Sequence, residues 1–201
     1  LMPSKVKDIQ KKLKKGSVYS ETNHTFIKGF GYLLPDQYLP QQEMGVVILK
    51  RSKAKVIHSM LRVRDVPGKT AWSRNWYLSP GQSKDLVPFD MQRDTLSGRC
   101  DWYLDEVEAR AADYQKRFPQ IKYYTVDLEA LNDLNTVKEM FAFFGLRAKD
   151  SLQAVVGKRL NVRAEFPPLG DIADLEAEQR QDPDLLPAEE KDQLLQKMID
   201  Y

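Results

Sequence analysis

Two side chains that can hold an anion follow an apolar run. Residues 46–49 are Val, Val, Ile and Leu, which is typical of a buried parallel strand, and Lys50 and Arg51 come next. Apolar residues at helical spacing begin near Lys53. Backbone N–H groups at such a helix start attract anions, Arg51 can donate a forked pair of hydrogen bonds, and Ser59 can add a hydroxyl. The alternative is a basic strand end with Ser59 on the helix surface.

A carboxylate and an imidazole follow a second short segment. Residues 18–20 are predicted to form a strand, and Glu21 and His24 come just after it. Open α/β sheets bind their ligands at the carboxyl ends of strands. Either side chain can serve there as a general base. The alternative is that Asn23 and His24 cap the next short helix.

Hydrophobic spacing predicts the elements that position these residues. Helices are expected over 4–15, 26–38, 53–64 and 100–118, and around Val137, with strands over 18–20, 46–49 and 121–126. Residues 65–98 carry little periodicity but several aromatic side chains, which indicates a long functional loop and argues against disorder. The elements alternate between strand and helix, so an α/β fold with a parallel sheet flanked by helices is predicted.

Four stretches of the sequence resemble the sulfotransferases that use 3′-phosphoadenosine 5′-phosphosulfate (PAPS). They are GVVILKRSKAKVIHSML at 45–61, YSETNHTFIKGF at 19–30, YYTVDLEALND with MFAFFGL between 123 and 146, and VVGKRLNVR at 155–163. The resemblance implies that the chain transfers a sulfuryl group from PAPS, without a metal, to a hydroxyl or amine of a small-molecule or carbohydrate acceptor. It covers roughly residues 4–165.

The resemblance also implies a role for particular residues. Arg51 and Ser59 would hold the 3′-phosphate of the nucleotide, and Glu21 or His24 would remove the proton of the acceptor. A basic loop would close over the 3′-phosphate and adenine, with candidate residues Gly157, Lys158, Arg159, Asn161 and Arg163. The order of basic residues differs from the better-known Arg-Lys-Gly form of the family, and the alternative is an ordinary basic loop.

The long segment 65–98 occupies the place of a variable loop that shapes the acceptor pocket in the family. Trp72, Trp76 and Tyr77 are its candidate acceptor-binding residues, although they could equally pin the loop to the core. The sequence Gly68-Lys69-Thr70 does not make a Walker A loop, because the motif needs a glycine where Val63 stands and a strand where a helix is predicted.

The implied fold is the P-loop NTP hydrolase-like sulfotransferase fold over residues 1–166, followed by an acidic tail at 167–201 with a terminal helix. We expect this fold to be N-terminally incomplete, because the family's first strand and its glycine- and lysine-containing loop for the 5′-phosphosulfate do not occur before Val18. Either the sequence is a fragment or the protein has lost the loop. The chain as given is therefore expected to lack turnover. The terminal helix could pack on this domain or join two copies into a homo-oligomer.

Charge distribution and cysteine content exclude some classes of protein and some kinds of site. The 201 residues carry a net charge of +2, but residues 1–17 hold six lysines and one aspartate, whereas residues 171–201 hold ten acidic and three basic residues. A basic face suits a phosphorylated ligand. The single cysteine, Cys100, excludes an internal disulfide and a cysteine-based zinc site. No membrane span or signal peptide is found, so we expect a soluble, cytoplasmic protein that binds no nucleic acid.

Two other functions fit the same pattern. A non-catalytic nucleotide-binding or scaffolding relative of the sulfotransferases would bind adenosine 3′,5′-bisphosphate without turnover. A kinase of the P-loop fold would use ATP and Mg²⁺, and the missing Walker A loop counts against it.

Overall fold

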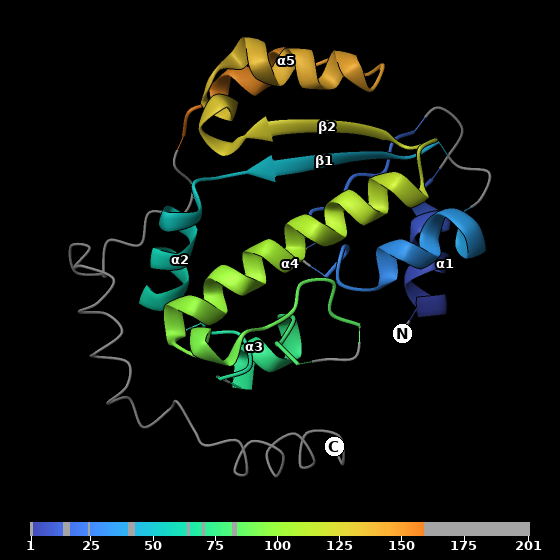
Figure 1. Ribbon diagram of the computed structural model, residues 1–201. Helices are drawn as coiled ribbons and strands as arrows, with labels where there is room; N and C mark the ends of the chain where they lie inside the picture. The colour runs from blue at the N-terminus through green and yellow to red at the C-terminus, as the bar shows by residue number, and fades with distance from the viewer. Residues whose placement is uncertain are drawn as a thin grey trace.

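The computed structural model describes residues 2–13, 17–23, 25–39, 43–63, 65–69, 71–81 and 84–158 (Figure 1). Within them the chain is a mixed α/β structure built on a small parallel sheet. Strand β1 (Gly45–Lys50) pairs with β2 (Lys122–Asp127), and the register places Gly45 opposite Lys122 and Lys50 opposite Asp127. The predicted parallel pairing is confirmed for these two strands.

Helices cover the two faces of this sheet, so its strands carry apolar side chains on both faces. Val46 and Tyr123 face α4 (Leu96–Arg117), where Tyr123 packs near Tyr114 with ring centroids 6.2 Å apart. Tyr124 faces α5 (Leu134–Phe143) and lies 5.3 Å from the Phe143 ring. Figure 1 shows α4 and α5 on opposite sides of the strands, as the predicted arrangement requires.

The crossover from β1 to β2 contains α2 (Lys53–Arg62), α3 (Ala71–Trp76) and α4. Helix α4 begins where the Thr95 side chain accepts a hydrogen bond from the Gly98 N–H, a standard N-cap. It ends at Arg117, two residues before Pro119. Its buried positions include Cys100, and α2 packs onto this part of α4 through Met60 and Leu61.

The amino-terminal part of the chain differs from two of the predictions. Residues 18–20 are irregular and not a strand, since the sheet of the described residues contains only β1 and β2. Residues 26–38 do not form one helix but a turn, a 3₁₀ segment (Phe30–Leu33) and one turn of π-helix (Leu34–Tyr38). Gly31 explains part of this path, because a Cβ there would lie 2.6 Å from the carbonyl oxygen of Phe26.

Helix α1 (Met2–Lys12) is shorter than the predicted 4–15 and packs Val6 and Ile9 against Leu34 and Leu39. Three short 3₁₀ segments complete the described structure: η3 (Met91–Arg93), η4 (Leu128–Asn132) and η5 (Asp150–Ala154). The predicted tail at 167–201 and its terminal helix lie outside the described residues. None of the helices described has the length and apolar character needed to span a membrane.

Candidate functional site

The end of β1 presents the predicted anion-binding residues in the predicted order. Lys50 is the last residue of β1, and Arg51 is exposed. Ser52 is the N-cap residue of α2, but its side chain makes no capping hydrogen bond to the helix. The first backbone N–H groups of a helix have no partner within it, so they remain able to bind an anion. Ser59 is exposed four residues after Lys55, which places these two side chains on one face of α2.

The segment after β2 lies beside this helix start. Parallel pairing aligns Lys50 with Asp127, so η4 begins next to the turn that carries Arg51. Glu129 in η4 accepts a hydrogen bond from Lys55, with 2.9 Å between Oε1 and Nζ. That bond lowers the pKa of Glu129, and the positive charge of Arg51 acts in the same direction. Arg51, Lys55 and Glu129 are therefore neighbours at the carboxyl end of the sheet.

Part of the predicted basic loop reaches the same end. Gly157 adopts a left-handed φ of 78°, and a Cβ built on it would lie 3.6 Å from the carbonyl oxygen of Asn132, the last residue of η4. Lys158 follows and is exposed. The structure thus brings Gly157 close to the segment that contacts Lys55. Three further candidates of this loop, Arg159, Asn161 and Arg163, lie outside the described residues.

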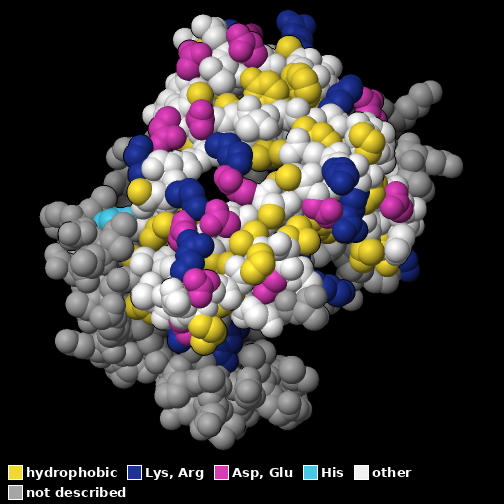
Figure 2. Space-filling model, in the orientation of Figure 1, with side chains coloured by type: hydrophobic (Ala, Val, Ile, Leu, Met, Phe, Trp, Pro, Cys, Tyr) yellow, Lys and Arg dark blue, Asp and Glu magenta, His cyan; other side chains and the backbone are white. Residues whose placement is uncertain are grey.

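Ion pairs to α4 hold the turn between β1 and α2 in place. Lys50 lies 2.8 Å from Glu108, and Lys53 lies 2.7 Å from both Asp101 and Asp105. The three carboxylates recur at i, i+4 and i+7, on one face of α4. Figure 2 shows Lys and Arg side chains interleaved with Asp and Glu side chains on this view of the molecule. Arg51, by contrast, is exposed and forms no ion pair with another residue in the described part of the chain.

The candidate general bases can be placed only in part. Glu21 is exposed and accepts hydrogen bonds at both oxygens, from the Tyr19 hydroxyl and from the Asn23 amide at 2.7 Å. The bond to Glu21 raises the pKa of Tyr19, which therefore keeps its proton as the donor. Asn23 also accepts from the Thr25 N–H, which shapes the turn. His24, the second candidate, lies outside the described residues.

The turn after Glu21 contacts the predicted acceptor-binding segment. The Lys28 ammonium donates to the Trp76 carbonyl and lies 4.6 Å from the centre of the Tyr77 ring. Tyr77 stacks on Tyr103 of α4 with centroids 4.9 Å apart, and its hydroxyl donates to Asp65 at 2.8 Å. Tyr77 is therefore pinned to α4, while Trp76 is exposed. Trp72 lies in α3, and its side chain is outside the described part.

Burial shifts the pKa values of the side chains in this cluster of Lys28, Asp65, Tyr77 and Tyr103. It lowers the pKa of Lys28 to about 8, and the nearby charge of Asp65 acts in the opposite direction. It raises the pKa of Asp65, whereas the hydrogen bond from Tyr77 and the charge of Lys28 lower it. Burial also raises the pKa values of Tyr77 and Tyr103, so both phenols stay neutral. At neutral pH the cluster holds one ammonium against two ring faces, an arrangement that stabilises a cation.

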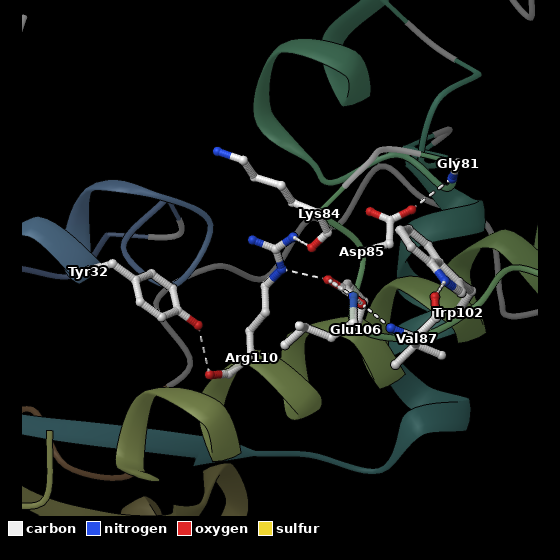
Figure 3. Close-up of polar contacts among 9 residues, drawn as sticks. Tyr32, Gly81, Lys84, Asp85, Val87, Trp102, Glu106 and Arg110 are labelled. Carbon is white, nitrogen blue, oxygen red and sulfur yellow. Dashed lines mark hydrogen bonds and ion pairs between the residues drawn. The ribbon is translucent and has the colours of Figure 1, made fainter. Parts of the chain in front are cut away.

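A buried carboxylate fixes the far part of the loop before α4. Glu106 is 0% exposed and accepts from the Leu86 and Val87 N–H groups at 2.9 and 2.8 Å. Arg110, one turn later, donates to its other oxygen at 2.6 Å, and the Trp102 indole donates to the Val87 carbonyl at 2.9 Å. Figure 3 shows these side chains converging from α4 on the loop. This network positions the segment before α4 and occupies both oxygens of Glu106 with hydrogen bonds.

Several of these neighbours were missed by sequence reasoning. Lys55 and Glu129 could have been paired from the expected register, because the carboxyl ends of parallel strands meet at one edge of the sheet. Lys28, Asp65 and Tyr103 carried no such signal, since they meet only after three separate segments pack together. The loop at Gly68 follows α2, in agreement with the rejection of a Walker A loop there.

Comparison with protein-family models, with curated proteins and with solved structures finds no match for this chain. A function must therefore be argued from the residues at the carboxyl end of the sheet.

Proposed function

We propose that this chain binds the nucleotide of PAPS at the carboxyl ends of β1 and β2 and serves in sulfuryl transfer to a hydroxyl or amine. One observation carries the proposal. An arginine without an ion pair to any described residue follows β1, at the start of a helix that presents Ser59. Helix starts of this kind bind phosphates, and a guanidinium matches a phosphate with two parallel hydrogen bonds. The fold we propose is the P-loop NTP hydrolase-like sulfotransferase fold.

In this proposal Arg51 and Ser59 bind the 3′-phosphate, and Gly157, which lies beside the last residue of η4, and Lys158 assist them. The acceptor oxygen or nitrogen attacks sulfur and loses its proton to Glu21 or His24. The bond between sulfur and the bridging oxygen breaks, and adenosine 3′,5′-bisphosphate leaves with the electron pair. The acceptor, a small molecule or a carbohydrate, would lie near Trp76 and the pinned Tyr77, which Lys28 joins to the turn after Glu21.

The first test is the affinity for adenosine 3′,5′-bisphosphate, measured by calorimetry. Arg51→Ala should weaken binding at least about tenfold, because a charged bidentate contact contributes about 1.5–3 kcal/mol. Arg147→Ala is the matched control. It follows α5 near the other end of the sheet, since Phe144 packs against Gly45 at the start of β1. Equal affinities for the wild type and Arg51→Ala would rule out this phosphate site.

The second test separates catalysis from binding. In a protein that turns over PAPS, loss of the true base should lower turnover by about 10²–10⁴ and leave nucleotide affinity unchanged. Glu21→Gln and His24→Ala are the variants to compare, with radiolabelled PAPS and a panel of phenols, sugars and amines. If both variants keep near-normal turnover, another group accepts the proton.

A non-catalytic nucleotide-binding relative is the second candidate, and the hydrogen bonds at both oxygens of Glu21 favour it. To take the proton of the acceptor substrate, the Glu21 carboxylate would have to give up one of these two hydrogen bonds. This candidate predicts the same loss of affinity in Arg51→Ala, with no label transfer by the wild type.

A further inference from the structure

The salt bridge between Lys55 and Glu129 lies at the proposed phosphate site but adds little to the stability of the fold. Its side chains are 59% and 53% exposed. Exposed pairs of this kind contribute little to stability, because water screens the charges and the long side chains lose freedom when they pair. The bridge can therefore open at small cost, and the free ammonium of Lys55 would then lie on the face of α2 that carries Ser59.

Glu129 also places a negative charge where the proposal needs a phosphate. It lies within the field of both Lys55 and Arg51, which together hold its pKa below the usual range. A phosphate that binds Arg51 would repel this carboxylate and attract the ammonium to which it is bonded. The phosphate and Glu129 thus compete for the same cation.

We propose that Lys55 is a further phosphate ligand, which Glu129 occupies in the empty site and which the 3′-phosphate takes over on binding. This inference rests on the proposed function. It makes Glu129 a competitor that lowers affinity for every anion, and a doubly charged phosphate displaces it more readily than a singly charged anion does. Lys55 positions and binds but takes no part in breaking the sulfur–oxygen bond.

A second exposed ion pair, at the other end of the sheet, makes the inference testable. Lys122 and Glu43 form an exposed bridge at the opposite, amino-terminal end of β2, and that bridge likewise lowers the pKa of Glu43. Neutralising either carboxylate removes one negative charge from the protein. Only Glu129→Gln frees a cation beside Arg51, so Glu43→Gln controls for net charge.

The experiment is calorimetric titration of the full chain and its variants with adenosine 3′,5′-bisphosphate at about 50 mM and about 500 mM salt. At low salt, Glu129→Gln should strengthen binding by about three- to fivefold and Lys55→Ala should weaken it by a similar factor, the range that an exposed pair provides. Both effects should shrink at high salt because the charges are exposed. The gain from Glu129→Gln should be smaller in a Lys55→Ala background.

The outcomes distinguish this inference from the function on which it rests. If Arg51→Ala weakens binding while Lys55→Ala and Glu129→Gln do not change it, the phosphate site stands and the inference is wrong. An equal gain in Glu129→Gln and Glu43→Gln would also overturn it, because net charge alone would then explain the effect. If the wild type shows no binding at either salt concentration, the phosphate site and the inference both fall.

Discussion

Lys28 holds its charge in an unusual place for a lysine, above two stacked tyrosine rings and partly out of water. Its ammonium is 4.6 Å from the Tyr77 centroid and 5.2 Å from that of Tyr103. The ring faces, the Trp76 carbonyl and Asp65 favour the cation, while burial disfavours it. Lys28 therefore joins three segments of the chain. The free energy needed to bury its charge depends on pH.

The pH dependence of stability follows from the direction of that shift. Burial lowers the pKa of Lys28 to about 8, whereas an unfolded lysine titrates near about 10.4. Between these values the unfolded chain binds the proton and the folded chain does not, so the free energy of unfolding should rise with pH. We expect the wild type to gain stability relative to Lys28→Met between about pH 7.5 and about pH 9.5, measured by urea denaturation.

The tyrosines change the stability of both proteins in the opposite direction at higher pH. Their raised pKa values mean that the unfolded state loses phenol protons first above about pH 10, which lowers stability as pH rises. Parallel stability curves for the wild type and Lys28→Met across the window would show that Lys28 does not titrate below its ordinary range.

At the scale of elements, α4 organises its neighbours with two kinds of polar contact. One face carries three carboxylates, the half-buried Asp101 and Asp105 and the exposed Glu108, that hold Lys50 and Lys53 at the turn after β1. The buried Glu106 instead accepts backbone N–H groups from the loop that precedes the helix. The first set orients the candidate site, and the second keeps an irregular segment packed on the core, because buried N–H groups need partners.

The two kinds of contact should differ sharply in their effect on stability. Glu106→Ala should lower the free energy of unfolding by about 3–5 kcal/mol, because it leaves the Arg110 charge and two backbone N–H groups without their acceptor. Replacing Glu106 and Arg110 together by Leu and Met should cost less than Glu106→Ala. Glu108→Ala, on the same helix but in the exposed pair with Lys50, should cost no more than about 1 kcal/mol.

Chemical denaturation of the variants measures these differences. Equal losses in Glu106→Ala and Glu108→Ala would show that the buried network is no stronger than the surface pairs.

At the scale of the whole molecule, Tyr114 joins the amino-terminal segment, α4 and β2. It is almost fully buried, its ring contacts those of Phe26, Tyr32 and Tyr123, and its hydroxyl donates to the Gly31 carbonyl at 3.1 Å. Residues that are 83 positions apart are joined by this one hydrogen bond. The irregular path of residues 26–38 is therefore stabilised by contacts with α4 and not by a helix of its own.

Removing that hydroxyl tests this role. Tyr114→Phe should lower the free energy of unfolding by about 0.5–1.5 kcal/mol, because it removes one of the two hydrogen bonds to the buried Gly31 carbonyl, which keeps the bond from the Leu34 N–H. Tyr124→Phe is the control, since Tyr124 packs on α5 through its ring. We expect the control to change stability by less than about 0.5 kcal/mol, as surface substitutions do. Equal losses in the two variants would contradict the role of Tyr114.

Elements whose pattern is local could be predicted from the sequence. The apolar run at 46–49 predicted β1, and periodic apolar residues predicted α2 and α4. The order of Arg51 and Ser59 around the start of α2 was also readable, because strand end, turn and helix are contiguous in the chain. When one face of a helix or a whole strand is buried, its apolar residues recur at a fixed spacing in the sequence. That spacing can be recognised without knowing which segment the element packs against.

The other features depend on packing between distant segments, which no local pattern in the sequence predicts. Residues 18–20 have the composition of a strand, but a strand also needs a neighbour to complete its hydrogen bonds, and the described sheet joins β1 to β2 instead. The meeting of Lys55 with Glu129, and of Lys28 with Tyr77, likewise depends on which distant segments pack together. Such pairings leave no period in either segment, because the partner of each charge is set by register and packing across the whole fold.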